Sequence, residues 1–187
     1  MQEVIRKNST DNMNKKPAGN TPLLVFLLTA VLLLGLWFVV YHLWLKPIGT
    51  LDNFLTGITA KFAAYSLAPW YTIEISKLDN LYSLNLAGTP ILGIARNCNG
   101  LEVMAIFAGF IAAFPGSIKH KLWYLPAGIV ALFMLNIVRC IALTLVQLHY
   151  PQWLDFNHKF TFVVVIYGAM FYLWYIWVNR FSSYTER

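Results

Sequence analysis

The feature that most constrains this fold is a long run, Pro22–Leu45, that contains no Asp, Glu, Lys or Arg. A helix that crosses the hydrocarbon core of a bilayer, about 30 Å thick, needs roughly 20 such apolar residues. The run is too long for the apolar region of a cleaved signal peptide, and no A-x-A-like cleavage site follows it. We therefore predict a retained transmembrane helix over residues 22–45.

Three further apolar stretches follow, at residues 99–114, 122–148 and 160–178. Hydrophobic residues make up 58% of the 187-residue chain and charged residues only 12%, about half the usual share of roughly 25%. A soluble protein of this size could not bury so much apolar surface. We predict an all-α multi-pass membrane protein with about four transmembrane helices. Residues 98–180 would form a three-helix transmembrane unit.

The positive charges indicate the orientation. Four spans would place eight of them on one side of the membrane: Arg6, Lys7, Lys15, Lys16, Lys119, Lys121, Arg180 and Arg187. Lys and Arg concentrate on the cytoplasmic side of membrane proteins. We therefore expect a cytoplasmic (inner) membrane protein with a disordered cytoplasmic tail at 1–21, a second cytoplasmic tail at 181–187, and residues 46–97 facing outward.

The outward segment has two periodic parts. Apolar residues at helical spacing between Leu51 and Tyr65, with Asp52, Asn53, Thr56 and Lys61 opposite, predict an amphipathic helix on the outer membrane surface. A re-entrant or additional spanning role for residues 51–68 stays open. Further on, alternation over 82–86 and again over 91–95, broken by Gly88-Thr89-Pro90, predicts a short β-hairpin.

Arg139 is the one charge inside the third apolar stretch. A charge within a span is costly, and by default it indicates function. Its position along the helix places it in the outer leaflet, and Asn136, three residues earlier, shares its face. The alternatives are an arginine that reaches outer lipid headgroups, or a purely structural pair with Glu102.

Two further reactive residues fall on the same outer side. Cys98 precedes the second span and is followed by Asn99 and Gly100; the start of a helix favours a thiolate, although Glu102 opposes this unless Arg139 neutralises it. His158 opens the fourth span and can take and return a proton. His149 is a competing base, further out in the loop.

Cys98, His158 and Arg139 together supply a nucleophile, a proton-transfer base and a fixed cation, which are the parts needed for acyl transfer. Two alternatives stay open. A non-enzymatic scaffold or assembly partner would use the same polar residues for helix packing, and a thiol–disulfide carrier would pair Cys98 with Cys140, although no C-x-x-C is present. No spacing indicates a metal or phosphate site, so we expect no cofactor. The basic excess indicates lipid contact rather than nucleic-acid binding.

Taken in order, four motifs are similar to those of the exosortase/archaeosortase family. They are Asn97-Cys98-Asn99-Gly100-Leu101, then Phe114-Pro115-Gly116-Ser117 with a basic loop, then Leu135-Asn136-Ile137-Val138-Arg139, and then His158 before the last span. Together they cover about half of the chain. Asn99 stands where the family usually has serine, and the chain is compact beside longer exosortases.

The resemblance implies a membrane-embedded cysteine protease or transpeptidase that works through a thioester on Cys98, with Arg139 and His158 as the other catalytic residues. Asn136, Asn99, Gly100 and Glu102 would support them. The implied substrates are exported proteins with a C-terminal motif, a transmembrane helix and a basic cluster, cleaved at the outer face. The acceptor, whether water, lipid, glycan or amine, is left open.

Overall fold

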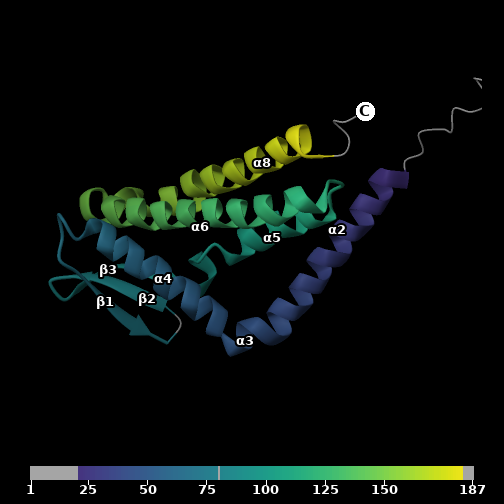
Figure 1. The fold of residues 1–187 in the computed structure, drawn as a ribbon. Coiled ribbons are helices and arrows are strands. Elements are labelled where there is room, and N and C mark those ends of the chain that lie inside the picture. Colours follow the sequence, from purple (N-terminus) through teal and green to yellow (C-terminus); the bar gives the residue numbers. More distant parts are fainter. Residues whose placement is uncertain (1–20, 80, 183–187) are drawn as a thin grey trace, which may run out of the picture.

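The computed structural model describes residues 21–79 and 81–182. Apolar helices form most of it, and a small antiparallel sheet lies at one end (Figure 1). This architecture confirms the prediction of a helical membrane protein. Most of the predicted tail at 1–21, and residues 183–187 of the predicted tail at 181–187, lie outside the described residues.

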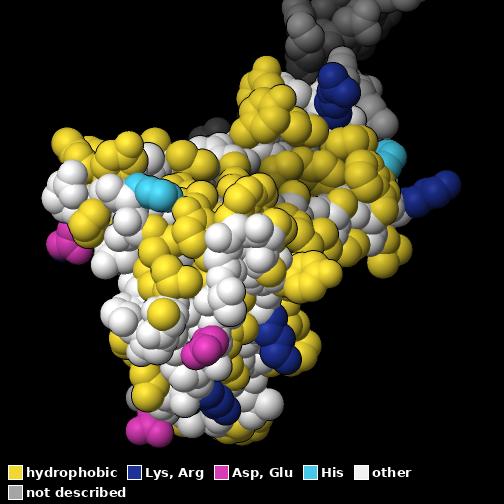
Figure 2. All heavy atoms as spheres, turned by 90° about the vertical axis from the view of Figure 1, so that its left-hand side faces the viewer, with side chains coloured by type: hydrophobic (Ala, Val, Ile, Leu, Met, Phe, Trp, Pro, Cys, Tyr) yellow, Lys and Arg dark blue, Asp and Glu magenta, His cyan; other side chains and the backbone are white. Residues whose placement is uncertain are grey.

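Helix α2 (Thr21–Val40) exposes large apolar side chains along its length, including Val31 and Leu32 at 68% and 70% exposure. Such a surface is unfavourable in water but suits hydrocarbon, where apolar side chains meet lipid tails. Figure 2, a view from one end of the molecule, shows hydrophobic side chains over most of the upper part, while several charged side chains lie on the lower part.

The chain leaves α2 through a wider helical turn, Tyr41–Leu45, and the short α3 (Lys46–Ile48), and then reverses into α4 (Thr50–Leu67). The reversal is at Gly49, whose φ is +67°. The Arg96 guanidinium lies 2.9 Å from where a Cβ on this residue would stand. Glycine is required here for both its backbone conformation and its small size.

The predicted helix over residues 51–65 is confirmed as part of α4, but its faces were assigned wrongly. Asp52 and Thr56, expected toward water, are each 1% exposed, whereas Phe54 and Tyr65 are 63% and 82% exposed. Short side chains let α4 pack closely against α6 and the sheet. The Asp52 carboxylate accepts from the Tyr41 hydroxyl, and the Thr56 hydroxyl donates to the carbonyl oxygen of Asp52 within α4. The large aromatic side chains are directed outward.

The sheet has three strands in the order β1 (Ile73–Leu78), β2 (Leu81–Leu86) and β3 (Thr89–Ala95). The predicted hairpin corresponds to β2 and β3. They join at Ala87 and Gly88, which both have positive φ as a tight hairpin turn requires. The prediction missed β1, whose side chains are almost all exposed and therefore give little packing signal.

The second half of the chain consists of three packed helices. They are α5 (Leu101–Ala113), α6 (Ile118–His149) and α8 (Phe162–Arg180), the last preceded by the short turns Pro151–Trp153, α7 (Leu154–Phe156) and Asn157–Thr161. Phe107 of α5 is fully buried in their core. Its ring occupies the place where a Cβ on Gly128 of α6 would stand, so glycine lets the two helices approach.

The helix lengths support the expectation of about four spans only in part. In the described part of the chain, three helical segments are long and apolar enough to cross a membrane: Leu23–Ile48, Ile118–His149 and Pro151–Arg180. The predicted second span contains only the 13-residue α5, about 20 Å long at 1.5 Å per residue. It is shorter than a hydrocarbon core because the chain around Cys98 forms a turn instead of continuing the helix. Helix α4 is not among the helices that are long and apolar enough to cross a membrane.

Candidate active site

Cys98 lies at the end of a tight helical turn, Arg96–Cys98, that connects strand β3 to helix α5. Its Sγ is 3.7 Å from Nε2 of His158, which belongs to the turn Asn157–Thr161 at the start of α8. This is hydrogen-bonding distance for sulfur, between residues 60 positions apart in the sequence. The tertiary structure therefore brings a thiol and an imidazole from different helices into direct contact.

Asn136 of α6 fixes the backbone beside the thiol. Its Nδ2 donates to the carbonyl oxygen of Cys98 at 3.1 Å. Gly100, two residues after Cys98, has φ +81°, and a Cβ there would stand 3.2 Å from Cγ of Asn136. A glycine at this position lets the chain turn sharply into α5 while it stays against Asn136.

A buried polar network supports the same turn from the other side. Asn99, 2% exposed, donates from Nδ2 to Oδ1 of Asp52 at 2.8 Å and accepts the backbone N–H of Leu101 at 2.9 Å. The Tyr41 hydroxyl donates to the Asp52 carboxylate at 3.2 Å. The network joins the end of α2, helix α4 and the turn that carries Cys98. Asn99 therefore holds the turn through its amide, at the position where the resemblance leads one to expect a serine hydroxyl.

Arg139 is half-buried one turn after Asn136 on α6. It makes no hydrogen bond or ion pair with any residue in the described ranges, and its Nε is buried. The ion pair with Glu102 considered as a structural alternative is absent, and Glu102 is exposed. The guanidinium is therefore free to bind an acceptor that comes from outside the chain.

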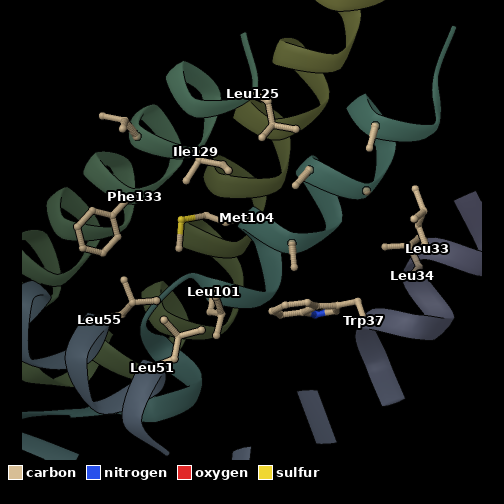
Figure 3. A pocket seen from close by; sticks show the side chains of 15 residues that line it. Leu33, Leu34, Trp37, Leu51, Leu55, Leu101, Met104, Leu125, Ile129 and Phe133 are labelled. Carbon is tan, nitrogen blue, oxygen red and sulfur yellow. The ribbon is translucent and has the colours of Figure 1, made fainter. Parts of the chain in front are cut away.

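Two cavities flank α5. The polar cavity, of about 190 Å³, lies between α5, α6 and α8 and is lined by Arg139 and Asn136 together with Asn97, Gly100 and Glu102. The apolar cavity, of about 630 Å³, lies between α2, α4, α5 and α6. Figure 3 shows its labelled lining, from Trp37 of α2 to Phe133 of α6, which contains none of the predicted site residues. The larger cavity is therefore not the one beside the thiol.

The structure thus places the predicted site residues around one point: Cys98, His158, Asn99, Gly100 and Asn136 through direct contacts, and Arg139 and Glu102 through the polar cavity. The competing base is elsewhere, because His149 hydrogen-bonds the hydroxyl of Tyr71 at 2.9 Å. In the described ranges, Cys98 and Cys140 are both free thiols, and no group of His, Cys, Asp and Glu is arranged to hold a metal ion.

Sequence reasoning missed Asp52 and Tyr41. It placed Asp52 on the water side of an amphipathic helix and gave Tyr41 no role in the site. The available signal was an acidic residue among small residues that recur at helical spacing, Thr56, Ala60 and Ala63. In a membrane protein such a face also suits close packing between elements.

A thiol in contact with an imidazole, near an arginine that has no partner among the described residues, has the composition of an acyl-transfer site. A family model described as a transmembrane exosortase matches residues 18–176, a range that includes all the residues placed at this site. No curated protein and no solved structure matches the chain. Because the family model matches most of its length, the chain belongs to the transmembrane exosortase family.

Proposed function

We propose that this exosortase-family membrane protein is a cysteine transpeptidase or protease that processes the C-terminal sorting region of exported proteins. Such a region would contain a short motif, a transmembrane helix and a basic cluster. The observation that carries the proposal is the 3.7 Å contact between Sγ of Cys98 and Nε2 of His158. It is supported by Arg139, which has no partner among the described residues.

In the proposed reaction, His158 accepts the thiol proton as Sγ of Cys98 attacks the scissile carbonyl carbon. Arg139 stabilises the negative charge on the carbonyl oxygen, which has more effect where water is largely excluded. The C–N bond then breaks, His158 protonates the leaving amine, and a thioester remains on Cys98. Water or another nucleophile resolves the thioester. Asp155 does not orient His158 here, because its carboxylate pairs with Lys159 at 2.8 Å.

The lengths of the helices support a site near the outer membrane face. Tyr41, Asn136 and His158 lie about 20, 18 and 22 residues from the ends of α2, α6 and α8 at the opposite side of the bundle (Figure 1). At 1.5 Å per residue these lengths are roughly 27–33 Å, about one hydrocarbon thickness. The first turn of α6, at that opposite side, carries Lys119 and Lys121, which suits the cytoplasm.

The position of α5 also supports four crossings. It begins beside Asn136, and near its other end Nζ of Lys121 donates to the carbonyl oxygen of Ala112 at 2.7 Å. Helix α5 and the non-helical residues on each side of it therefore connect the level of the site to the beginning of α6. We propose that this shorter segment completes a fourth crossing, sheltered between longer helices.

The proposal is tested by comparing Cys98→Ala with Cys140→Ala in cells that export a reporter carrying a native sorting tail from the same genome. Cys140 is the matched control, because it is the other thiol of the chain and is buried away from solvent. We expect Cys98→Ala to reduce processing by at least about three orders of magnitude and Cys140→Ala to leave it close to wild type. Normal processing by a well-expressed Cys98→Ala variant would exclude the thioester mechanism.

The outward orientation is tested separately with a membrane-impermeant maleimide added to intact cells whose outer barrier has been removed. We expect Cys98 to be labelled from outside, and Cys98→Ala to lose the label. Labelling that occurs only after the membrane is permeabilised would place the thiol on the cytoplasmic side and contradict the proposed topology.

A further inference from the structure

The polar cavity lies beside Cys98. Asn97 and Gly100, on either side of the nucleophile in the sequence, both line it, whereas Cys98 itself does not. Its volume of about 190 Å³ is below the roughly 300–1,000 Å³ of sites for whole small molecules. A space of this size and position suits a residue of a peptide chain next to the one that Cys98 attacks.

The polar groups at this cavity have unused hydrogen-bonding capacity. Asn136 is 1% exposed, and its Oδ1 is buried with no partner among the described residues, while its Nδ2 holds the carbonyl of Cys98. Arg139 next to it offers only donors and also has no partner there. Buried polar groups without partners are unfavourable, so an occupant that supplies both bonds is favoured. A main-chain amide would complement this pair, because its N–H can donate to Oδ1 of Asn136 and its carbonyl oxygen can accept from Arg139.

The rest of the cavity is lined by apolar residues and by Tyr167, which carries a hydroxyl. Its walls include Val103 of α5, Leu132 of α6, and Phe162 and Ile166 of α8. Glu102, which is exposed, also borders it and offsets the positive charge of Arg139. A neutral, apolar residue fits these walls better than a charged side chain, which would lose its hydration on entering.

We propose that the polar cavity binds an apolar residue of the substrate on the membrane side of the scissile bond, through hydrogen bonds from that residue's main-chain amide to Asn136 and Arg139. This inference rests on the proposed function and adds to it a subsite and a side-chain preference. The residues that line the cavity indicate on which side of the scissile bond the bound residue lies. From Asn136 the cavity extends toward Leu132 on α6 and Ile166 on α8, which is toward the ends of the helices that face away from the site.

The test measures binding without turnover. The purified full-length protein in detergent micelles is alkylated with iodoacetamide, and the rate at Cys98 is followed by mass spectrometry. N-acetyl-leucinamide and N-acetyl-glycinamide are the competing probes. We expect the leucine probe to slow alkylation at a concentration roughly tenfold lower than the glycine probe, because a filled apolar pocket discriminates against missing methylene groups. Equal effects of the two probes, or no effect of either, would overturn the proposal.

Two substitutions on one helix provide the matched comparison. Val103→Phe fills the polar cavity, whereas Ala105→Phe, two residues along α5, projects into the apolar cavity. We expect the first to abolish the preference for the leucine probe and the second to retain it. The alkylation rate without probe shows whether Val103→Phe folds. If it does not fold, Val163→Phe takes its place, because Val163 of α8 is exposed and lines the polar cavity.

The outcome is independent of the Cys98→Ala processing experiment. A leucine preference that survives Val103→Phe and Val163→Phe would refute the subsite even if Cys98 is the nucleophile. Conversely, the preference and its loss in these variants would establish the subsite even if the sorting reaction assigned to the chain proved wrong.

Discussion

The two sides of helix α5 offer an instructive contrast. On one side the cavity of about 630 Å³ is lined by apolar side chains from four helices (Figure 3). On the other, the cavity of about 190 Å³ is lined by Asn136, whose buried amide oxygen has no partner among the described residues, and by Arg139, which also has none there. In a bilayer an apolar hollow can be filled by lipid chains at little cost, so it needs no dedicated ligand. Polar groups without partners do need a ligand. They therefore indicate a functional site better than the volume of a cavity does.

The difference originates in the sequence of α5 itself. The face toward the larger cavity carries the small residues Ala105, Ala108, Gly109 and Ala112, which leave space. At the start of the helix, Gly100, Glu102 and Val103 line the smaller cavity together with Asn136 and Arg139. One short helix thus separates a space without polar groups from the proposed catalytic centre. Four substitutions test this contrast; the first is expected to have the largest effect and the last the smallest.

The largest effect is expected from Arg139→Leu. Removing a group that stabilises developing negative charge typically lowers turnover by about 10²–10³-fold, whereas stability should hold or rise because an uncompensated, partly buried charge is lost. Processing of the tailed reporter and thermal melting in detergent measure the two quantities. Phe133→Leu, on the same helix but in the apolar cavity, is the control and should process normally. Wild-type processing by Arg139→Leu would remove the arginine from the mechanism.

Gly128→Ala tests the contact that holds α5 between the two cavities. The added methyl group overlaps the ring of Phe107, and overpacking of this kind costs about 1–3 kcal/mol. We expect a clear fall in melting temperature. Gly35→Ala on α2 has open space around the new Cβ, so it should be neutral or slightly stabilising. Equal melting of the two variants would show that the core around Phe107 can rearrange.

Tyr41→Phe tests the network behind Cys98. It deletes the hydroxyl that donates to the buried carboxylate of Asp52, and a bond to a charged group contributes about 1.5–3 kcal/mol. We expect reduced stability, and processing lowered several-fold because Asn99 and the turn at Cys98 lose support. The rate of Cys98 alkylation reports the turn directly. An unchanged alkylation rate together with reduced stability would assign the network a purely structural role.

The smallest effect is expected from Ala108→Leu, which fills part of the apolar cavity. Cavity filling commonly changes stability by about 0.5–2 kcal/mol in the favourable direction, and processing should stay within about twofold of wild type. The same reporter and melting assays apply. A large loss of processing would break the contrast, since it would show that the apolar cavity binds something that the reaction needs.

The membrane itself explains how the sequence could place the proposed site residues at a similar depth. When apolar stretches of fixed length cross a layer of fixed thickness, the residues at their ends must lie at similar depth. That argument alone placed Cys98, Arg139 and His158 on the same side. The contact between Cys98 and His158 could not be predicted in this way, because the depth of a residue in the membrane does not say how its helix is rotated relative to the others.

Asp52 illustrates where the pattern misled. Amphipathic periodicity indicates which side chains of α4 share a face, but the usual assignment of polar residues to water fails beside lipid. Here the face with Asp52 and Thr56 packs inward, and Phe54 and Tyr65 are exposed. Strand β1 was missed for a related reason: backbone pairing defines it, and its side chains are mostly exposed.

The sequence by itself determined the class of the protein, the depth of its reactive residues and the motifs of its family, because hydrophobic length and charge act locally along the chain. Only the tertiary structure decided which helix faces meet. It set the 3.7 Å approach of His158 to Cys98, buried Asp52 beneath the turn, and left Arg139 facing a cavity without a partner among the described residues. These outcomes depend on side-chain packing between elements distant in sequence, where a rotation of one helix exchanges one set of contacts for another.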